Sequence, residues 1–183
     1  MNFITIDQWD EEIWRQASFI YTQAFGKSGA KPEKIIGNMF AKQLCFLHVV
    51  IKENEVIAMA LTGKLEGTKA LLIDYLAVRD DYRNQGIGHK LLHYIKGWCI
   101  TQGNFDSIMI EVEADKTPEN LKRIHFWEKS NFQLTDYIHQ YIWVPEPYQA
   151  MYLKLLPEAK IPTKGEQLFQ YIIHFHKDSF RLK

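Results

Sequence analysis

The sequence predicts a mixed α/β fold, a sheet with helices on both faces. Two observations lead to this class. Three strand-like runs follow one another between residues 44 and 79 with turn residues between them, and after Arg83 helical and strand-like patterns alternate. The third run, residues 70–78, is nearly continuous in apolar residues, which is typical of a strand that is covered on both faces.

The first half of the chain is expected to hold a strand, two helices and a three-stranded antiparallel meander. These elements are expected at residues 3–6, 9–25, 32–41, 44–52, 56–65 and 70–79. Apolar residues recur at helical spacing in the first helix, which Gly26 ends, and Pro32 opens the second helix. Asn54 and Gly67 fall between the strands and predict turns there.

The second half is expected to alternate helix and strand and then to close the sheet. Its elements are expected at residues 86–98, 107–114, 117–130, 132–138 and 149–156. Thr117 and Pro118 supply an N-cap and a first helical residue for one of these helices. Side chains alternate in the strand before it, so Glu111 and Glu113 share the side opposite to three β-branched residues.

One domain is expected at residues 1–156, followed by a linker that contains Pro157 and Pro162. From Gly165 onward apolar residues recur at helical spacing and predict an amphipathic helix. Residues 157–183 are therefore expected to be a linker and a helical extension, which either straps the sheet or joins two subunits of a homodimer.

The composition is that of an ordinary globular domain. The 183 residues carry 22 Lys+Arg and 22 Asp+Glu, and this zero formal net charge gives no field that would attract nucleic acid or an anionic membrane. Cys45 and Cys99 cannot form a disulfide framework, which fits a reducing compartment. No signal-like run opens the sequence, and no apolar stretch approaches the ~20 residues that cross a bilayer. A cytoplasmic location is expected.

The most informative segment leads from the buried strand 70–78 through a loop into the next helix. The loop reads Arg83-Asn84-Gln85-Gly86-Ile87-Gly88. Free N–H groups and the positive dipole end at a helix start bind phosphate, glycines let the backbone approach it, and Arg83 can add a charge-assisted contact. The P-loop and Rossmann patterns both fail here, because the first needs Lys-Ser/Thr after its second glycine and the second needs three glycines. Taken alone, the six residues fit a plain strand–helix turn equally well.

The surroundings of this loop favour a known family. The next helix ends in Phe126-Trp127-Glu128-Lys129-Ser130-Asn131-Phe132. Together, the Arg-x-x-Gly-x-Gly loop and this segment resemble the GNAT superfamily of acyl-CoA-dependent N-acetyltransferases. The resemblance covers the order of elements over residues 1–156 and is specific over residues 72–132. It implies a mixed sheet, mostly antiparallel, whose central parallel strands splay apart.

The resemblance also implies acetyl-CoA as co-substrate and a set of residues that hold it. The backbone of residues 83–88 would bind the pyrophosphate of coenzyme A. Backbone groups of Leu76, Ala77 and Val78 would bind the pantetheine arm, and Asn120 matches a position that often contacts the cofactor.

One departure from the family pattern concerns the general acid. The family commonly has a tyrosine that protonates the departing thiolate where this sequence has Trp127, whose indole N–H does not titrate usefully. Tyr137, Tyr141 or water are the alternatives. The departure also motivates a second hypothesis, a catalytically weak acyl-CoA-binding sensor or regulatory domain.

The catalytic base is expected to be a carboxylate, because an amine must be neutral to attack a thioester. Asp74 is the only charge in strand 70–78, and the equally favoured alternative is a buried Asp that is bonded to backbone or to a polar neighbour. Glu111 is expected to act as base or to bind the substrate, and Glu113 and Tyr75 are expected to line the same site.

The expected acceptor is the primary amine of a small molecule, attacked directly within a ternary complex. Glu111 and Glu113 would attract a cationic amine. No metal is expected, because the histidine pair His89 and His93 lacks the acidic partner of a zinc helix. The pair His174 and His176 likewise has no acidic or cysteine partners beside it in the sequence, which makes metal binding there unexpected as well.

Overall fold

The computed structural model describes residues 1–27 and 29–182. Within them the sheet has the strand order β1-β2-β3-β4-β5-β7-β6, and every neighbouring pair is antiparallel except β4 and β5. The strands are β1 (Asn2–Ile6), β2 (Cys45–Lys52), β3 (Glu55–Lys64), β4 (Ala70–Val78), β5 (Ser107–Glu113), β6 (Gln133–Gln140) and β7 (Pro147–Lys154). The helices are α1 (Glu11–Phe25), α2 (Glu33–Ala41), α3 (Ile87–Trp98), α4 (Pro118–Glu128) and α5 (Gly165–Phe180).

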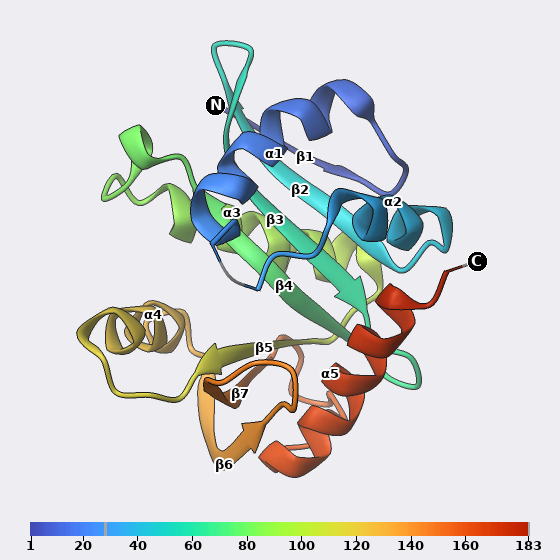
Figure 1. Cartoon of the computed structure of the whole chain (residues 1–183), viewed down its shortest axis with the longest axis vertical. Coiled ribbons are helices and arrows are strands. Elements are labelled where there is room, and N and C mark those ends of the chain that lie inside the picture. Colours follow the sequence, from blue (N-terminus) through green and yellow to red (C-terminus); the bar gives the residue numbers. More distant parts are fainter. Residues whose placement is uncertain (28, 183) are drawn as a thin grey trace.

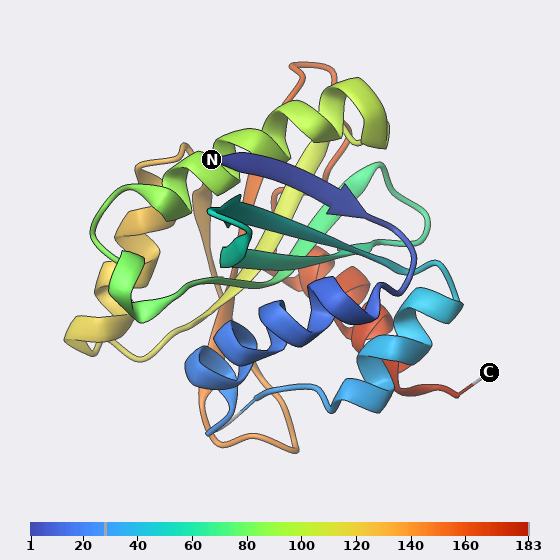
Figure 2. The same ribbon diagram turned by 90° about the horizontal axis from the view of Figure 1, so that it is seen from above.

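Helices cover both faces of the sheet, as the sequence predicts. Figure 2 shows α1, α2 and α5 on one face and α3 on the other. Apolar side chains of α1, α2 and α5 form one core cluster with the sheet, and those of α3 and α4 form a second cluster on the other face. Because β4 contributes side chains to both clusters, the double covering predicted for residues 70–78 is confirmed.

Side-chain caps mark the starts of α1 and α4, and element boundaries shift by a few residues from those expected. The Asp10 side chain accepts a hydrogen bond from the Ile13 N–H (2.9 Å) at the start of α1. The predicted cap of α4 is confirmed, since Thr117 accepts from the Asn120 N–H (3.2 Å). The last hairpin differs from expectation, because β6 extends to residue 140 and β7 begins at Pro147, a position where a strand loses little by lacking an N–H.

The two central strands diverge, as the family resemblance implies. Pairing between β4 and β5 ends at Leu72 and Met109, and Figure 1 shows the strands separating beyond that point. β4 also carries a β-bulge that could not be predicted from the sequence. On β3, Leu61 pairs with Tyr75 and Thr62 with Ile73, which leaves Asp74 without a partner. The bulge interrupts the alternation, so Asp74 and Tyr75 both lie on the face of α1, α2 and α5.

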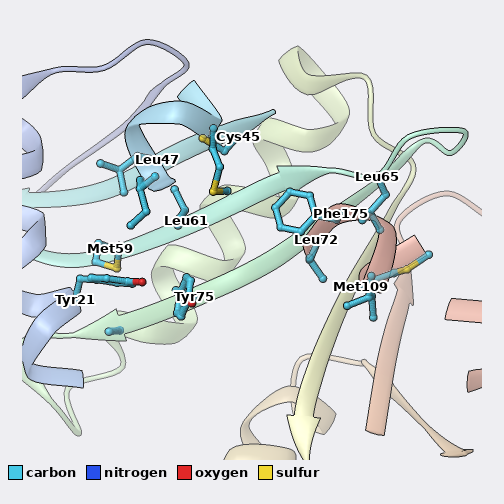
Figure 3. Packing of buried hydrophobic residues seen from close by; sticks show 14 of the residues in the cluster. Tyr21, Cys45, Leu47, Met59, Leu61, Leu65, Leu72, Tyr75, Met109 and Phe175 are labelled. Carbon is cyan, nitrogen blue, oxygen red and sulfur yellow. The ribbon is translucent and has the colours of Figure 1, made fainter. Parts of the chain in front are cut away.

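The predicted C-terminal amphipathic helix is present as α5, and it packs on the sheet of its own chain. Its buried face joins the larger core cluster through four apolar residues, Leu168, Phe169, Ile172 and Phe175. Figure 3 shows Phe175 beside Leu65 and Leu72. The amine of Lys42, the residue that follows α2, donates to backbone carbonyls of Asp178 and Arg181, which ties the end of α5 to the end of α2. The domain boundary at residue 156 remains a prediction.

Both cysteines are free and buried, and burial raises the pKa of the Cys99 thiol to about 12. In the part of the chain that the structure describes, no helix combines the length and the apolarity that crossing a membrane requires.

Candidate active site

The gap between β4 and β5 exposes backbone groups of β4. Val78 on β4 lies opposite Ala58 on β3. The Arg79 N–H, one residue further along β4, donates to the Ile57 carbonyl (2.9 Å). In an antiparallel ladder this bond makes Val78 and Ala58 a non-hydrogen-bonded pair. The N–H and C=O groups of Val78 therefore point away from β3, and those of Leu76 follow by the two-residue alternation. Two of the three residues predicted to bind a pantetheine arm thus turn their backbone toward the gap, whereas Ala77 faces β3.

The predicted phosphate loop leads from this gap into α3. Asn84 and Gly86 have left-handed backbone angles (φ 60° and 73°), and no atom lies within 4 Å of the place where a β-carbon on Gly86 would stand. The first intrahelical hydrogen bond joins the Lys90 N–H to the Gly86 carbonyl (3.1 Å). The N–H groups of Ile87 and Gly88 therefore precede the hydrogen-bond ladder of the helix. Together with the open space at Gly86, they fit an anion.

Three other residues that were predicted to hold the cofactor have partners within the chain. Arg83 donates to the Val78 carbonyl (Nε to O, 3.2 Å) and pairs with Asp80 (2.7 Å), and half of its side chain is exposed. The Gln85 amide donates to the Asp81 carbonyl (3.1 Å). The buried Asn120 amide donates to the Asp115 carbonyl (2.9 Å), and its oxygen accepts from Arg123 (2.8 Å).

On the α5 face of the gap, the structure brings together five polar side chains from five parts of the chain. This polar cluster consists of Lys31, Asp74, Glu111, Tyr141 and His176. Lys31 Nζ lies 2.5 Å from Asp74 Oδ2 and 3.2 Å from His176 Nδ1. Glu111 Oε1 lies 2.6 Å from His176 Nε2, and Glu111 Oε2 accepts from the Tyr141 hydroxyl (2.7 Å).

The polar cluster is largely withdrawn from solvent, which strengthens its internal electrostatics. The side chains of Lys31, Asp74, His176 and Glu111 are 4%, 5%, 15% and 18% exposed. Burial alone would raise the pKa of the Glu111 carboxyl, but the hydrogen bond and charge of His176, followed by Tyr141 and Lys31, lower that pKa below its usual value. Burial, reinforced by the Glu111 charge, raises the pKa of Tyr141 and keeps its hydroxyl protonated.

Aromatic side chains hold the backbone of Lys31 in place. Tyr21 donates to the Lys31 carbonyl (3.0 Å), and the Tyr75 hydroxyl accepts from the Lys31 N–H (3.2 Å) while it donates to the Gly29 carbonyl (2.6 Å). The Lys31 ammonium also lies 5.2 Å from the centre of the Tyr75 ring. Tyr75, predicted to bind substrate, thus uses its hydroxyl to fix the α1–α2 connection.

The structure separates the remaining predicted site residues. Of the two tyrosines proposed as general acid, Tyr141 joins the polar cluster, whereas the Tyr137 hydroxyl lies 3.4 Å from His139 Nδ1. Glu113 pairs across the sheet with Tyr148, further along β5 and outside the polar cluster. Trp127 packs against Phe126 and Phe132 with ring centroids 5.0 and 5.1 Å away.

Two members of the polar cluster, Lys31 and His176, were not predicted from the sequence. His176 lies four residues after the buried Ile172 and so continues the apolar stripe of α5. This position in the sequence could have indicated that His176 faces the sheet.

The expectation that no acidic partners lie near His174 and His176 is wrong, because both histidines contact carboxylates in the folded chain. The fold brings distant segments to α5, so that His176 meets Glu111 and His174 meets Glu66 (2.9 Å). His174 also meets Asp178 (3.1 Å), one turn further along α5.

Comparisons with known proteins agree on one family. Residues 6–132 match the family described as "Acetyltransferase (GNAT) family". "Probable N-acetyltransferase san" of Drosophila melanogaster is 30% identical over 115 residues, which cover 61% of this chain and 60% of that protein. The chain thus spans less than two thirds of the length of this relative.

Solved structures share the fold at low sequence identity. A structure from Bacteroides thetaiotaomicron that is assigned to the GNAT family superposes with a TM-score of 0.71 at 15% identity, covering 97% of this chain and 95% of that one. An aminoglycoside 6'-N-acetyltransferase complexed with coenzyme A superposes with a TM-score of 0.67 at 14% identity, covering 87% of this chain and 100% of that one.

Proposed function

The chain belongs to the GNAT family of acetyltransferases, and from this membership we propose that it transfers the acetyl group of acetyl-CoA to an amine. One observation carries the proposal. The gap between β4 and β5 has unpaired amides and a helix start at one end and a polar cluster of acid–base groups on one face. Such a gap can hold a long anionic thioester and bring an amine to it.

Coenzyme A would lie along β4 and end at α3. The free N–H groups within residues 83–88 would bind the pyrophosphate, and the Arg83 side chain would leave the Asp80 carboxylate to add its charge, whereas the Arg83 N–H donates to the Asp80 carbonyl (3.2 Å). Backbone groups of Leu76 and Val78 would hold the pantetheine arm in place of a neighbouring strand, and an N–H in this stretch would polarise the thioester carbonyl. The related fold complexed with coenzyme A supports this arrangement. Ala77 and Asn120 remain predicted contacts of the cofactor.

The acceptor would be a cationic primary amine, in the form of a small molecule. The polar cluster has one formal positive charge on Lys31 and formal negative charges on Asp74 and Glu111, which leaves an excess of one negative charge when His176 is neutral. Because these side chains are at most 18% exposed, a slender amine can approach them more easily than a folded protein surface can. Glu113 and Tyr75 remain predicted contacts of the substrate.

Transfer would proceed by direct attack of the amine on the thioester carbon. Asp74 and Glu111 are the candidate carboxylates for removing the amine proton. Tyr137, Tyr141 and water remain the candidates for protonating the leaving thiolate, and of the two tyrosines only Tyr141 belongs to the polar cluster.

Thiol release tests the proposal. Acetyl-CoA is incubated with the protein and spermidine, tyramine, kanamycin or a tetrapeptide with a free N-terminus, and calorimetry measures coenzyme A binding separately. We expect amine-dependent release with a small cationic amine. Tight binding without amine-dependent release would favour the alternative, an acyl-CoA-binding sensor, which Trp127 in the usual tyrosine position motivates. Neither binding nor release would refute both.

A further inference from the structure

We propose that His176 of α5 is the catalytic base that takes the amine proton, and that Glu111 is its positioning residue. This inference rests on the proposed function and deepens it. α5 lies outside residues 6–132, which match the family, so the assignment adds a group from a different part of the chain.

The hydrogen-bond partners fix which nitrogen of His176 can accept a proton. The Lys31 ammonium can only donate, so His176 Nδ1 accepts from it (3.2 Å). Nε2 then carries the ring hydrogen and donates to Glu111 Oε1 (2.6 Å). A base that is held by a carboxylate on its other nitrogen is the arrangement of a general base with an orienting group.

Glu111 is better placed to orient the base than to be the base. Both of its oxygens already accept hydrogen bonds, one from His176 and one from Tyr141 (2.7 Å). The hydrogen bonds from His176 and Tyr141, which do not require a charged imidazole, also lower its pKa and make it a weak proton acceptor at neutral pH. As an anion, however, it stabilises the imidazolium that forms when His176 takes up a proton.

The charged and titratable side chains around His176 come from four other segments of the chain. Lys31 precedes α2, Asp74 is on β4 and Glu111 on β5, and Tyr141 and His139 lie at the end of β6. Lys31 binds Asp74 at 2.5 Å and His176 at 3.2 Å, so the longer bond is the one that an incoming amine can replace while Asp74 retains the ammonium.

The proton and electron balance of the step is complete. The amine nitrogen attacks the thioester carbon, a C–N bond forms and the C–S bond breaks, and the electron pair leaves on sulfur. His176 Nδ1 takes the first proton from the cationic amine, which leaves the nitrogen neutral for the attack, and the second proton that the nitrogen loses passes through solvent to the thiolate. The imidazolium returns its proton to solvent, so no oxidant, reductant or further reactant is needed.

His176→Gln is the decisive variant, because a glutamine amide can still donate to Glu111 but cannot take up a proton. With the best amine of the thiol-release panel, we expect kcat to fall about 100-fold or more, which is the size of a general-base contribution. The KM for acetyl-CoA should change less than about twofold, and the acid limb of the kcat–pH profile should disappear. His174→Gln is the matched control on the same helix, since His174 is 52% exposed and bonded to Glu66, and it should keep the wild-type profile.

The pH profile of Glu111→Gln provides the second readout. If Glu111 had a purely structural role, the acid limb of this profile would not move. Loss of the carboxylate destabilises the imidazolium, so the acid limb should shift to lower pH. An active wild type with unchanged kcat and acid limb in His176→Gln overturns the assignment of His176 and leaves the proposed function intact. If His176→Gln does not bind coenzyme A, an acid limb that stays in place in Glu111→Gln overturns the assignment. A wild type that is inactive on every amine refutes the proposed function and this inference together.

Discussion

Phe175 on α5 lies so close to Gly63 on β3 that a β-carbon on the glycine would overlap the ring. This contact holds α5 next to the gap between β4 and β5, and it also fixes the position of His176, which follows Phe175 directly. The absence of a side chain at residue 63 is therefore a condition for building the polar cluster.

Gly63→Ala should displace the Phe175 ring and destabilise the protein. An extra methyl group in a packed core costs about 1–3 kcal/mol, and moving α5 should also pull His176 away from Glu111. Urea unfolding should show the loss, and acetyl transfer should fall more than coenzyme A binding. Gly97→Ala is the control, since no atom lies within 4 Å of its β-carbon position on α3. Equal stability of the two variants would contradict the anchoring role.

Lys31 and Asp74 should be coupled strongly in folding stability. Their charged groups lie 2.5 Å apart with 4% and 5% of the side chains exposed, so removal of one partner leaves the other charge buried. We expect Lys31→Met and Asp74→Asn each to cost about 3–5 kcal/mol, and the double variant to cost clearly less than their sum. Urea unfolding of the four proteins measures this coupling. Additive costs would show that the pair is not a buried ion pair in solution.

The elements that local patterns specify could be predicted, and those that depend on partners could not. Alternation places Glu111 on the correct side of β5, and the glycine spacing locates the loop before α3. The bulge at Asp74 depends on how β4 aligns with β3, which no local pattern records. Lys31 and His176 are 145 residues apart in sequence, so only the packing of α5 against the sheet reveals that they meet.

Gly86→Asp should weaken coenzyme A binding by more than tenfold if the loop binds pyrophosphate. The new carboxylate would lie beside the free amides of α3, and a left-handed residue other than glycine costs about 1–2 kcal/mol of backbone strain. Gly86→Asn separates the two effects, because asparagine tolerates this conformation without adding charge. Calorimetry should therefore show a much smaller loss for Gly86→Asn. Similar losses in the two variants would attribute the effect to the backbone alone.

His48 should make the protein less stable as the pH falls from 7 to 5. It is fully buried in β2, between Thr5 Oγ1 (2.7 Å) and Thr62 Oγ1 (2.9 Å), and burial lowers its pKa to about 3. Below a pH of about 6.5, His48 binds a proton in the unfolded chain but stays neutral in the folded protein. The free energy of unfolding therefore falls by up to ~1.36 kcal/mol for each pH unit by which the pH is lowered.

Between pH 7 and 5 this amounts to about 2 kcal/mol, in a range where carboxylates with ordinary pKa values contribute little. His48→Gln cannot be protonated and should flatten the dependence in urea unfolding at pH 7, 6 and 5. His93→Gln is the exposed control on α3 and should keep the wild-type slope. If His48→Gln kept the wild-type slope of unfolding free energy against pH, a group other than His48 would have to be the one that stays unprotonated in the folded state.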